Sequence, residues 1–375
     1  MKQSFKFLNS IFEESQLIFD KKKISSELLN CVKFNSIVLG IVRPSNKNQI
    51  ISLVKKCQIK KIKLYVYSTG NNWGYGSKNP VCDGCLLVDL SDMKNIINYD
   101  FRVGNVVIEP GVTQGSLCDY LLGANDEYII NATGAGPNCS VIGNCLERGF
   151  GVGYFNESFD TVISLEVVLP NGDLIETGYS HFKDSNVSGI RSFGIGPDLN
   201  GIFAQSNLGI VVSAKIKLQK KPEYCELMVC GLKSYDSVFS VVDKISDLKS
   251  NNILPNTVQI FNKLRMVSVL MGKSNLDENQ ISEKDINFYS KKYSLSEWNI
   301  LSVVWGKKAQ VKVMKSEIKK SLNSDCSRLV FFSSSKIKLL KKFPNLLSFV
   351  TRLNIKELAD SLEGSFNFLM GDHLI

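Results

Sequence analysis

Apolar runs of two kinds alternate along the first part of the chain. Residues 36–44 (SIVLGIVRP) and 63–68 (KLYVYS) are rich in β-branched and aromatic residues, which predicts two strands. Between them, apolar positions over residues 46–60 recur at helical spacing, and Ser45 can cap this helix. The pattern predicts a βαβ-like unit. Upstream of it, the mixed polar and apolar positions of residues 11–36 indicate helix.

The β-rich pattern continues beyond this unit. Residues 86–90 (LLVDL) and 105–111 (NVVIEPG) predict two further strands, and residues 113–123 predict an amphipathic helix. Residues 161–178 contain two β-rich runs around an Asn-Gly pair at positions 171–172, which fits a hairpin with a type I′ turn.

The pattern changes after Pro222, where glycines become sparse and apolar runs alternate with Lys-rich helical stretches. Strands are predicted at ELMVCGL, NTVQIFN and NILSVVWG, and helices at VKVMKSEIKKSLN and IKLLKKFPNLLSFV. The expected organisation has three parts: an N-terminal helical segment at residues 1–37, a first domain at 38–222 and a second domain at 223–375.

Composition narrows the class of protein. The 375 residues are 44% hydrophobic and 22% charged, which is ordinary globular usage and excludes a disordered chain. The net charge of +9 is spread along the chain without a dense basic block, so a nucleic-acid partner is not expected. No apolar run is long enough to span a bilayer, and the N-terminus lacks a signal-peptide pattern. We therefore expect a cytoplasmic protein that does not bind membranes.

Cysteine and histidine usage argues against a metal site. The ten cysteines are irregularly spaced, which suits free thiols in a reducing compartment. One CxxC pair, Cys82 and Cys85, leads into a predicted strand rather than a helix, and no second CxxC or His pair completes a zinc site. With only His181 and His373 in the chain, a His-based triad is improbable. No metal is expected.

Three glycine-rich segments carry the candidate chemistry. Residues 67–76 (YSTGNNWGYG) follow a predicted strand, and their glycines allow consecutive N–H groups to line a concavity that suits a diphosphate. Residues 134–153 hold six glycines but lack the third glycine of a GxGxxG fingerprint, because Cys139 stands there. Residues 196–218 combine a short helix, a glycine and a long strand. Alone, the first segment favours phosphate binding only modestly over a surface turn. The second is about as compatible with a set of tight turns, and the third alone indicates a structural role.

Taken together and in this order, the segments resemble the FAD-binding domain of the vanillyl-alcohol oxidase and p-cresol methylhydroxylase flavoprotein family. The resemblance covers residues of roughly 38–222 and is greatest to the phenol-oxidising members. It rests on five motifs: YSTGNNWGYGS, VVIEPGVTQGSLCDYL, SVIGNCLERGFGVG, LEVVLPNGDLIETG and GPDLNGIFAQSNLGIV.

The resemblance implies an α+β fold, with a two-subdomain FAD-binding domain of the PCMH type followed by a partial α+β cap domain. It implies that the first loop meets the FAD diphosphate and that later segments flank the flavin, ribityl and adenine parts. Tyr75 would help to hold a substrate phenolate and is the expected catalytic residue. The implied cofactor-binding residues are Thr69, Gly70, Asn71, Asn72, Trp73, Gly74, Tyr75, Gly76, Pro110, Gly111, Val112, Ser140, Gly143, Asn144, Arg148, Gly149, Gly209, Ile210 and Val211.

The activity implied is an FAD-dependent oxidoreductase that transfers a hydride from a small alcohol or alkyl-phenol to the flavin. Two alternatives remain: oxidation of a 2-hydroxy acid or sugar alcohol by the same domain, and a truncated flavin-binding protein without catalysis. The expected partners are a small-molecule substrate and, as electron acceptor, oxygen or a redox protein, and homo-oligomerisation is left open.

The sequence also departs from the family. Asn71 and Asn72 stand where related flavoproteins carry an FAD-linked His, which favours noncovalent FAD. Relatives are considerably longer, and their Tyr-Arg pair for the phenolate would lie beyond residue 375. Four arginines could act as anion partners instead, although surface roles are the simpler interpretation: Arg191, Arg265, Arg328 and Arg352.

Overall fold

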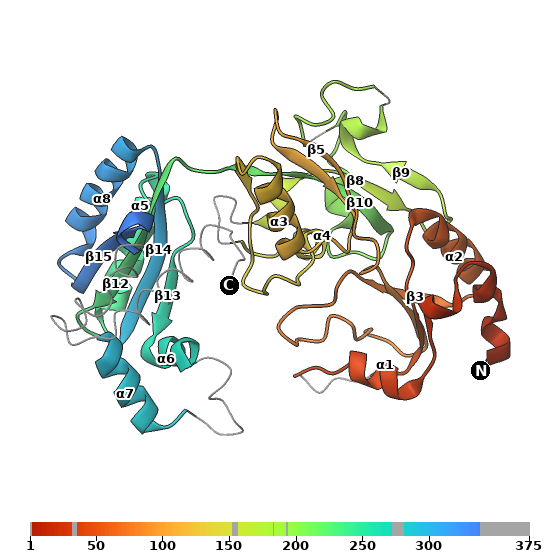
Figure 1. The fold of residues 1–375 in the computed structure, drawn as a ribbon, viewed down its shortest axis with the longest axis horizontal. Helices are drawn as coiled ribbons and strands as arrows, with labels where there is room; N and C mark the ends of the chain where they lie inside the picture. The colour runs from red at the N-terminus through yellow and green to blue at the C-terminus, as the bar shows by residue number, and fades with distance from the viewer. Residues whose placement is uncertain are drawn as a thin grey trace. The chain divides into compact units, whose positions relative to one another are not determined.

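The computed structural model describes residues 2–31, 36–151, 157–182, 184–192, 194–271 and 281–337 (Figure 1). The chain divides into two compact units, which are treated separately below. Unit 1 comprises Met1–Gly151 with Glu157–Lys220, and unit 2 comprises Val152–Asn156 with Lys221–Ile375.

The first sheet of unit 1 has four strands in the order β1-β2-β4-β3. Strands β2, β4 and β3 run parallel, and β1 pairs antiparallel with β2. The strands are β1 (Leu17–Ile18), β2 (Val38–Val42), β4 (Cys85–Asp89) and β3 (Lys63–Tyr67). The βαβ prediction is confirmed, since α2 (Lys47–Ile59) connects the parallel strands β2 and β3. All five residues of β4 are buried, as expected for a central parallel strand.

The cap of α2 differs from the sequence prediction. Asn46 is the N-cap, and its side-chain oxygen accepts a hydrogen bond from the Gln49 amide at 3.1 Å. Ser45 instead directs its N–H and hydroxyl toward the Gln49 side chain, at 2.8 Å and 3.2 Å from Oε1. Both residue types are good caps, and the choice depends on where the first helical turn begins.

The N-terminal segment packs onto unit 1 and is only partly helical. It contains 3₁₀ helices at Lys2–Ser10 and Glu14–Gln16 and the helix α1 (Lys21–Glu27). Phe5, Leu8 and Phe12 join the core cluster that α2 and the first sheet share. Within the stretch predicted to be helical, residues 17–18 form the edge strand β1 instead, because they pair with residues 41–42 of β2. The local sequence pattern does not indicate that a segment pairs with a distant strand.

The second sheet of unit 1 is antiparallel, in the order β5-β6-β10-β8-β9. Its strands are β5 (Ile96–Asp100), β6 (Asn105–Ile108), β10 (Ile210–Lys217), β8 (Val162–Val168) and β9 (Leu174–Glu176). The helix α3 (Gln114–Ala124) follows β6 as predicted, and Thr113 caps it. The short strands β7 (Tyr128–Ile129) and β11 (Gln219–Lys220) pair with each other.

The β8–β9 hairpin is confirmed, but its predicted turn type is wrong. Gly172 has a φ of +83°, whereas Asn171 is not among the described residues with positive φ. A type I′ turn needs positive φ at both central positions. The Gly172 amide donates to Leu169 O at 2.8 Å, and the Leu169 amide donates to Asp173 O at 2.8 Å. Pro170, Asn171 and Gly172 therefore form a three-residue loop that ends in a left-handed glycine.

Unit 2 is built on an antiparallel sheet in the order β13-β14-β12-β15. Its strands are β13 (Gln259–Asn262), β14 (Trp298–Gly306), β12 (Tyr224–Leu232) and β15 (Cys326–Ser333). Helices α5 (Ser237–Ser250) and α8 (Lys308–Leu322) contribute to one hydrophobic core with this sheet, and α6 (Lys263–Met271) and α7 (Glu283–Tyr293) complete the described helices. The three predicted strands and the helix at residues 311–323 are confirmed. The helix predicted at residues 337–350 lies almost wholly outside the described residues.

Candidate cofactor-binding site

The first glycine-rich loop follows β3 and has an unusual backbone. Gly70, Trp73, Gly74 and Gly76 all have φ between +62° and +91°. Within the described part of the chain, the main-chain N–H groups of residues 70–74 donate no hydrogen bond to a protein acceptor. Successive free N–H groups in such a loop form a concavity that suits an anion. The loop therefore has the donors that a diphosphate requires.

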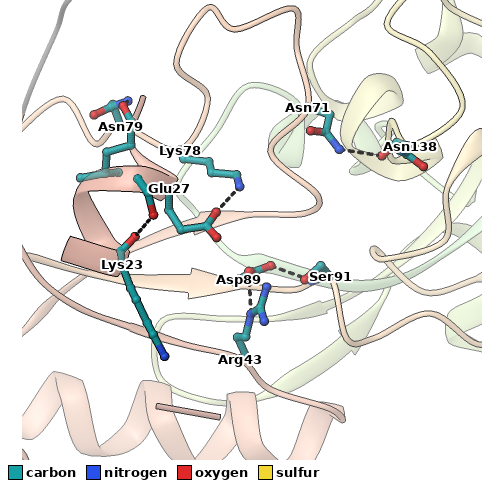
Figure 2. Close-up of polar contacts among 11 residues, drawn as sticks. Lys23, Glu27, Arg43, Asn71, Lys78, Asn79, Asp89, Ser91 and Asn138 are labelled. Carbon is teal, nitrogen blue, oxygen red and sulfur yellow. Dashed lines mark hydrogen bonds and ion pairs between the residues drawn. The ribbon is translucent and has the colours of Figure 1, made fainter. Parts of the chain in front are cut away.

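Side chains of this loop connect it to the second glycine-rich segment. Asn71 Nδ2 donates to Asn138 O at 2.9 Å, as Figure 2 shows, and Trp73 Nε1 donates to Gly134 O at 2.8 Å. At the start of the loop, Thr69 Oγ1 accepts a hydrogen bond from the Ser140 amide at 3.1 Å. Two segments that are some 65 residues apart in the sequence are thus held side by side.

A third segment joins them through Ser140. Its hydroxyl donates to Pro110 O at 2.6 Å and accepts from the Gly143 amide at 2.9 Å, which makes Ser140 the N-cap of α4 (Val141–Leu146). The Val141 amide donates to Val112 O at 3.1 Å. Residues 110–112 therefore support the first turn of α4. At the start of this turn, the Ser140 amide donates its hydrogen bond to Thr69 of the first loop.

Two glycines permit this close packing. A Cβ at Gly111 would lie 2.5 Å from Ser91 O and 2.6 Å from Met93 O, both of which are main-chain atoms. A Cβ at Gly143 would collide with the hydroxyl of Ser68. Only glycine fits at these two positions without a shift of neighbouring atoms.

The turn after α4 holds the other predicted residues of this segment. Arg148 has a φ of +51° and is exposed, with its guanidinium carbon 4.8 Å from the centre of the Phe159 ring. The Gly149 amide donates to Asn144 O at 2.8 Å. Asn144 Oδ1 is buried and has no hydrogen-bond partner among the described residues. Residues 152–153 of the predicted glycine-rich segment lie outside the described residues.

The third predicted segment reaches the end of α4. The Gln205 amide donates to Leu146 O at 2.9 Å, which ties the segment to α4. Gly209 precedes β10, where a Cβ would lie 2.5 Å from Val167 Cγ1. Ile210 is part of the core, and Val211 is also buried, so their side chains have structural roles. Only the main chain of residues 209–211 is a candidate for cofactor contact.

These residues fit an FAD cofactor by their chemistry. In addition to the free N–H groups, three buried oxygens of this loop region have no hydrogen-bond partner among the residues that the structure describes: Asn72 Oδ1, Ser77 Oγ and Asn79 Oδ1. Folded proteins leave few such atoms unpaired, so a cluster of them indicates a ligand or water. A Cβ at Gly74 or Gly136 would meet no atom within 4 Å, which leaves the backbone open there.

Lys78, a lysine next to the loop, is already engaged. Its Nζ lies 2.5 Å from Glu27 Oε2 (Figure 2). The same atom lies 5.7 Å from the centre of the Tyr67 ring. The side chain of Lys78 also lies where a Cβ of Gly70 would stand. An anion in this loop would therefore depend on main-chain donors, in agreement with the absence of a P-loop lysine from the sequence.

The two thiols near α4 are chemically quiet. Burial raises the pKa of Cys139 to about 11 and the pKa of Cys145 to about 12. Both thiols are therefore protonated near neutral pH and are poor nucleophiles. Cys82 and Cys85 are free, with sulfurs 3.6 Å apart, and Cys85 begins β4 as the sequence indicated. Among the residues that the structure describes, no cluster of three or more metal-binding side chains occurs.

The sequence missed the main-chain acceptors that orient the first loop. The carbonyls of Gly134 and Asn138 receive the Trp73 and Asn71 side chains. No residue type marks a carbonyl as an acceptor, so no sequence signal could have identified these contacts.

Comparisons with known proteins agree with this site. Residues 38–178 match a family model described as an FAD binding domain. The chain is 36% identical over 230 residues to 1'-carboxy-chondrochloren decarboxylase of Chondromyces crocatus, covering 61% of this chain and 42% of that protein. It is 29% identical over 308 residues to the 4-cresol dehydrogenase [hydroxylating] flavoprotein subunit of Pseudomonas putida, covering 81% of this chain and 58% of that one. The chain thus spans about half the length of these curated relatives.

Solved structures show the same fold. p-Cresol methylhydroxylase with substrate bound superposes with a TM-score of 0.81 and 23% identity, covering 98% of this chain and 72% of that chain. The 4-ethylphenol oxidase from Gulosibacter chungangensis, in its isoeugenol complex, superposes with a TM-score of 0.86 and 17% identity, covering 99% and 69%. Residues 38–178 match an FAD binding domain, and the chain is similar to flavoproteins of the p-cresol methylhydroxylase and vanillyl-alcohol oxidase family. The predicted resemblance to this family, the FAD cofactor and the α+β class are confirmed. Among the described residues, no helix has both the length and the apolar character needed to cross a bilayer.

Proposed function

We propose that the protein is an FAD-dependent oxidoreductase that takes a hydride from a small alcohol or alkyl-phenol. The observation that carries the proposal is the convergence of the first loop, residues 110–112 and the start of α4 through the hydrogen bonds of Thr69, Asn71 and Ser140. The name of the Pseudomonas putida relative, a cresol dehydrogenase, supports a phenolic substrate. Noncovalent FAD, and oxygen or a redox protein as electron acceptor, belong to the same proposal.

Each part of the loop has a role in this mechanism. The free N–H groups of residues 70–74 would bind the diphosphate and stabilise its negative charge, and the buried Asn72 and Asn144 oxygens would accept hydrogen bonds from donor groups of the cofactor. Bound FAD supplies the hydride acceptor, as flavins do in redox enzymes. Tyr75 donates its hydroxyl proton in a hydrogen bond to the phenolate oxygen, which stabilises the electron-rich form of the substrate.

Tyr75 is suited to this role because its side chain is free. It is 64% exposed, and its hydroxyl forms no hydrogen bond with the described residues. A Tyr75→Phe substitution should therefore leave stability unchanged. It should slow anaerobic flavin bleaching by 4-methylphenol about tenfold, since a charge-assisted hydrogen bond contributes on the order of 1.5–3 kcal/mol. Tyr120→Phe, at an exposed tyrosine of α3, is the matched control and should bleach at the wild-type rate.

The same measurement separates the alternatives. D-Lactate dehydrogenase [cytochrome] of Arabidopsis thaliana is 26% identical over 241 residues, which keeps a 2-hydroxy acid as the second candidate substrate. Bleaching by D-lactate but not by 4-methylphenol would contradict the phenol proposal. Bound flavin that no tested phenol, hydroxy acid or sugar alcohol reduces would favour a flavin-binding protein without catalysis.

A further inference from the structure

The sheet of unit 2 has two unlike faces. Side chains of Met228, Cys230 and Phe331 belong to the core that includes α5 and α8. Because side chains alternate along a strand, Val229 and Val330 lie on the opposite face. The pairings of Val229 with Leu301 and with Val330 place these three residues side by side on that face. They are half-buried and apolar.

Arg328 lies on the same apolar face. It stands two positions before Val330 in β15 and pairs with Gly231 of β12. The next pair is Leu232 with Cys326, so Ser327 is the extra residue of a β-bulge beside Arg328. The Ser327 hydroxyl donates to Gly231 O at 3.0 Å, which fixes the bulge. Bulges of this kind redirect side chains at the ends of strands and are common next to binding sites.

The guanidinium of Arg328 has no protein counter-ion. It forms no hydrogen bond or ion pair with the residues that the structure describes. Arg43, the other half-buried arginine in the described ranges, pairs with Asp89 at 3.0 Å, whereas the remaining described arginines are exposed. Burial lowers the pKa of Arg328, yet an arginine stays charged in a protein. A half-buried charge without a partner is unfavourable.

The neighbouring polar residue on this face does not supply a hydrogen-bond acceptor for the Arg328 guanidinium. Asn299, which pairs with Gly231 on the other side of β12, is already engaged at both ends of its amide. Its Nδ2 donates to Ser296 O at 2.8 Å, and its Oδ1 accepts from the Ser296 amide at 3.1 Å. The hydroxyls of Ser296 and Ser327 also lie on this face against Gly231, 3.0 Å from each other. Among the residues that the structure describes, the surroundings of Arg328 therefore offer apolar surface and neutral hydroxyls but no carboxylate. A ligand that complements this face has an apolar body and one anionic group.

We propose that this face of unit 2 binds a small aromatic carboxylate, with Arg328 on the carboxylate and the ring on Val229, Leu301 and Val330. The planar guanidinium matches the two oxygens of a carboxylate, which it can bind through two parallel hydrogen bonds. A simple phenol is neutral near pH 7 and offers a single oxygen, so it matches less well. This site goes beyond the proposed function, because it assigns a ligand to unit 2 by itself and does not depend on the flavin loops of unit 1.

The test compares benzoate with its neutral isostere benzamide by isothermal titration calorimetry of the purified full-length protein. The wild type should bind benzoate at least about tenfold more tightly, the preference expected of one charge-assisted pair. Arg328→Met keeps an unbranched side chain and removes the charge, so it should abolish the preference. Arg328→Lys should retain part of it. Arg265→Met, at an exposed arginine of α6, is the control and should keep the wild-type preference.

Circular dichroism and the thermal midpoint establish that each variant is folded. Equal affinity of the wild type for benzoate and benzamide would overturn the proposal, as would an undiminished preference in folded Arg328→Met. The affinity for 4-methylphenol, a neutral phenol, should be the same in the wild type and in Arg328→Met, and binding of this phenol that depends on Arg328 would also overturn the proposal. The two proposals can fail separately. If the benzoate preference depends on Arg328 but no phenol reduces the flavin, the proposed phenol oxidation is contradicted and the carboxylate site is supported.

Discussion

Gly111→Ala is expected to lower the free energy of unfolding by about 1–3 kcal/mol, the usual cost of an atom forced into a packed interior. The added Cβ would lie 2.5 Å from Ser91 O and 2.6 Å from Met93 O. These are main-chain atoms, so neither can rotate away. The Gly111 amide also donates to Met93 O at 2.6 Å, and a shift would strain this bond.

The displacement would also reach the cofactor site. Pro110 O accepts from the Ser140 hydroxyl and Val112 O accepts from the Val141 amide, so movement of residue 111 disturbs the start of α4. FAD affinity should therefore fall together with stability. Urea denaturation and FAD titration of the apoprotein measure the two effects.

Gly123→Ala provides the matched control for this glycine. Gly123 lies inside α3, and a Cβ there would meet no atom within 4 Å. Alanine is the better helix former by about 1 kcal/mol, so this variant should be slightly more stable than the wild type and bind FAD normally. If the two alanine variants unfold at the same urea concentration, the close approach at Gly111 does not limit stability.

Asn72→Leu should weaken FAD binding by about 10-fold to 100-fold without loss of apoprotein stability. The loss follows from removing a buried acceptor that we assign to the cofactor, which costs on the order of 1–3 kcal/mol. In the apoprotein, Asn72 Oδ1 has no hydrogen-bond partner among the described residues, so a leucine of similar volume removes an unpaired polar atom. FAD affinity should thus fall although the stability of the apoprotein does not, and a purely structural role of Asn72 would not produce this combination.

Asn98→Leu is the control for this substitution. Asn98 is exposed on the edge strand β5, and its side chain forms no hydrogen bond with the described residues. Fluorescence titration of apoprotein with FAD should give the wild-type affinity for this variant. An Asn72→Leu protein that is folded and binds FAD as tightly as the wild type would remove Asn72 from the site.

The sequence predicted regular elements well where the local pattern decides them. The helix over residues 46–60 has apolar positions at helical spacing, and the structure places α2 at Lys47–Ile59. The run at 86–90 consists mainly of apolar residues and forms the buried central strand β4. The local pattern did not predict strands that form because they pair with residues far away in the sequence. Residues 17–18 form a strand because they meet β2, and β15 was missed although its pairing with β12 spans eight residues of the chain.

At the candidate site too, the sequence indicated the segments but not their distant partners. Glycine spacing and motif order indicated which loops would hold the cofactor. The connections between the loops depend on hydrogen bonds to main-chain carbonyls, as in the bond from Asn71 to Asn138. Arg328 was one of four arginines that the sequence offered as anion partners, and only the strand register distinguishes it by placing it on an apolar face. The fold decides which residues come into contact in this way, and residue type alone does not indicate it.

The absorption spectrum of the purified protein, before and after acid precipitation, tests most directly whether the loops of unit 1 hold FAD. We expect a flavin spectrum in the native protein and release of all the flavin into the supernatant on precipitation, because the cofactor is held without a covalent bond. A protein that is colourless as purified, and that remains so after incubation with FAD and removal of the excess, would contradict FAD binding by these loops.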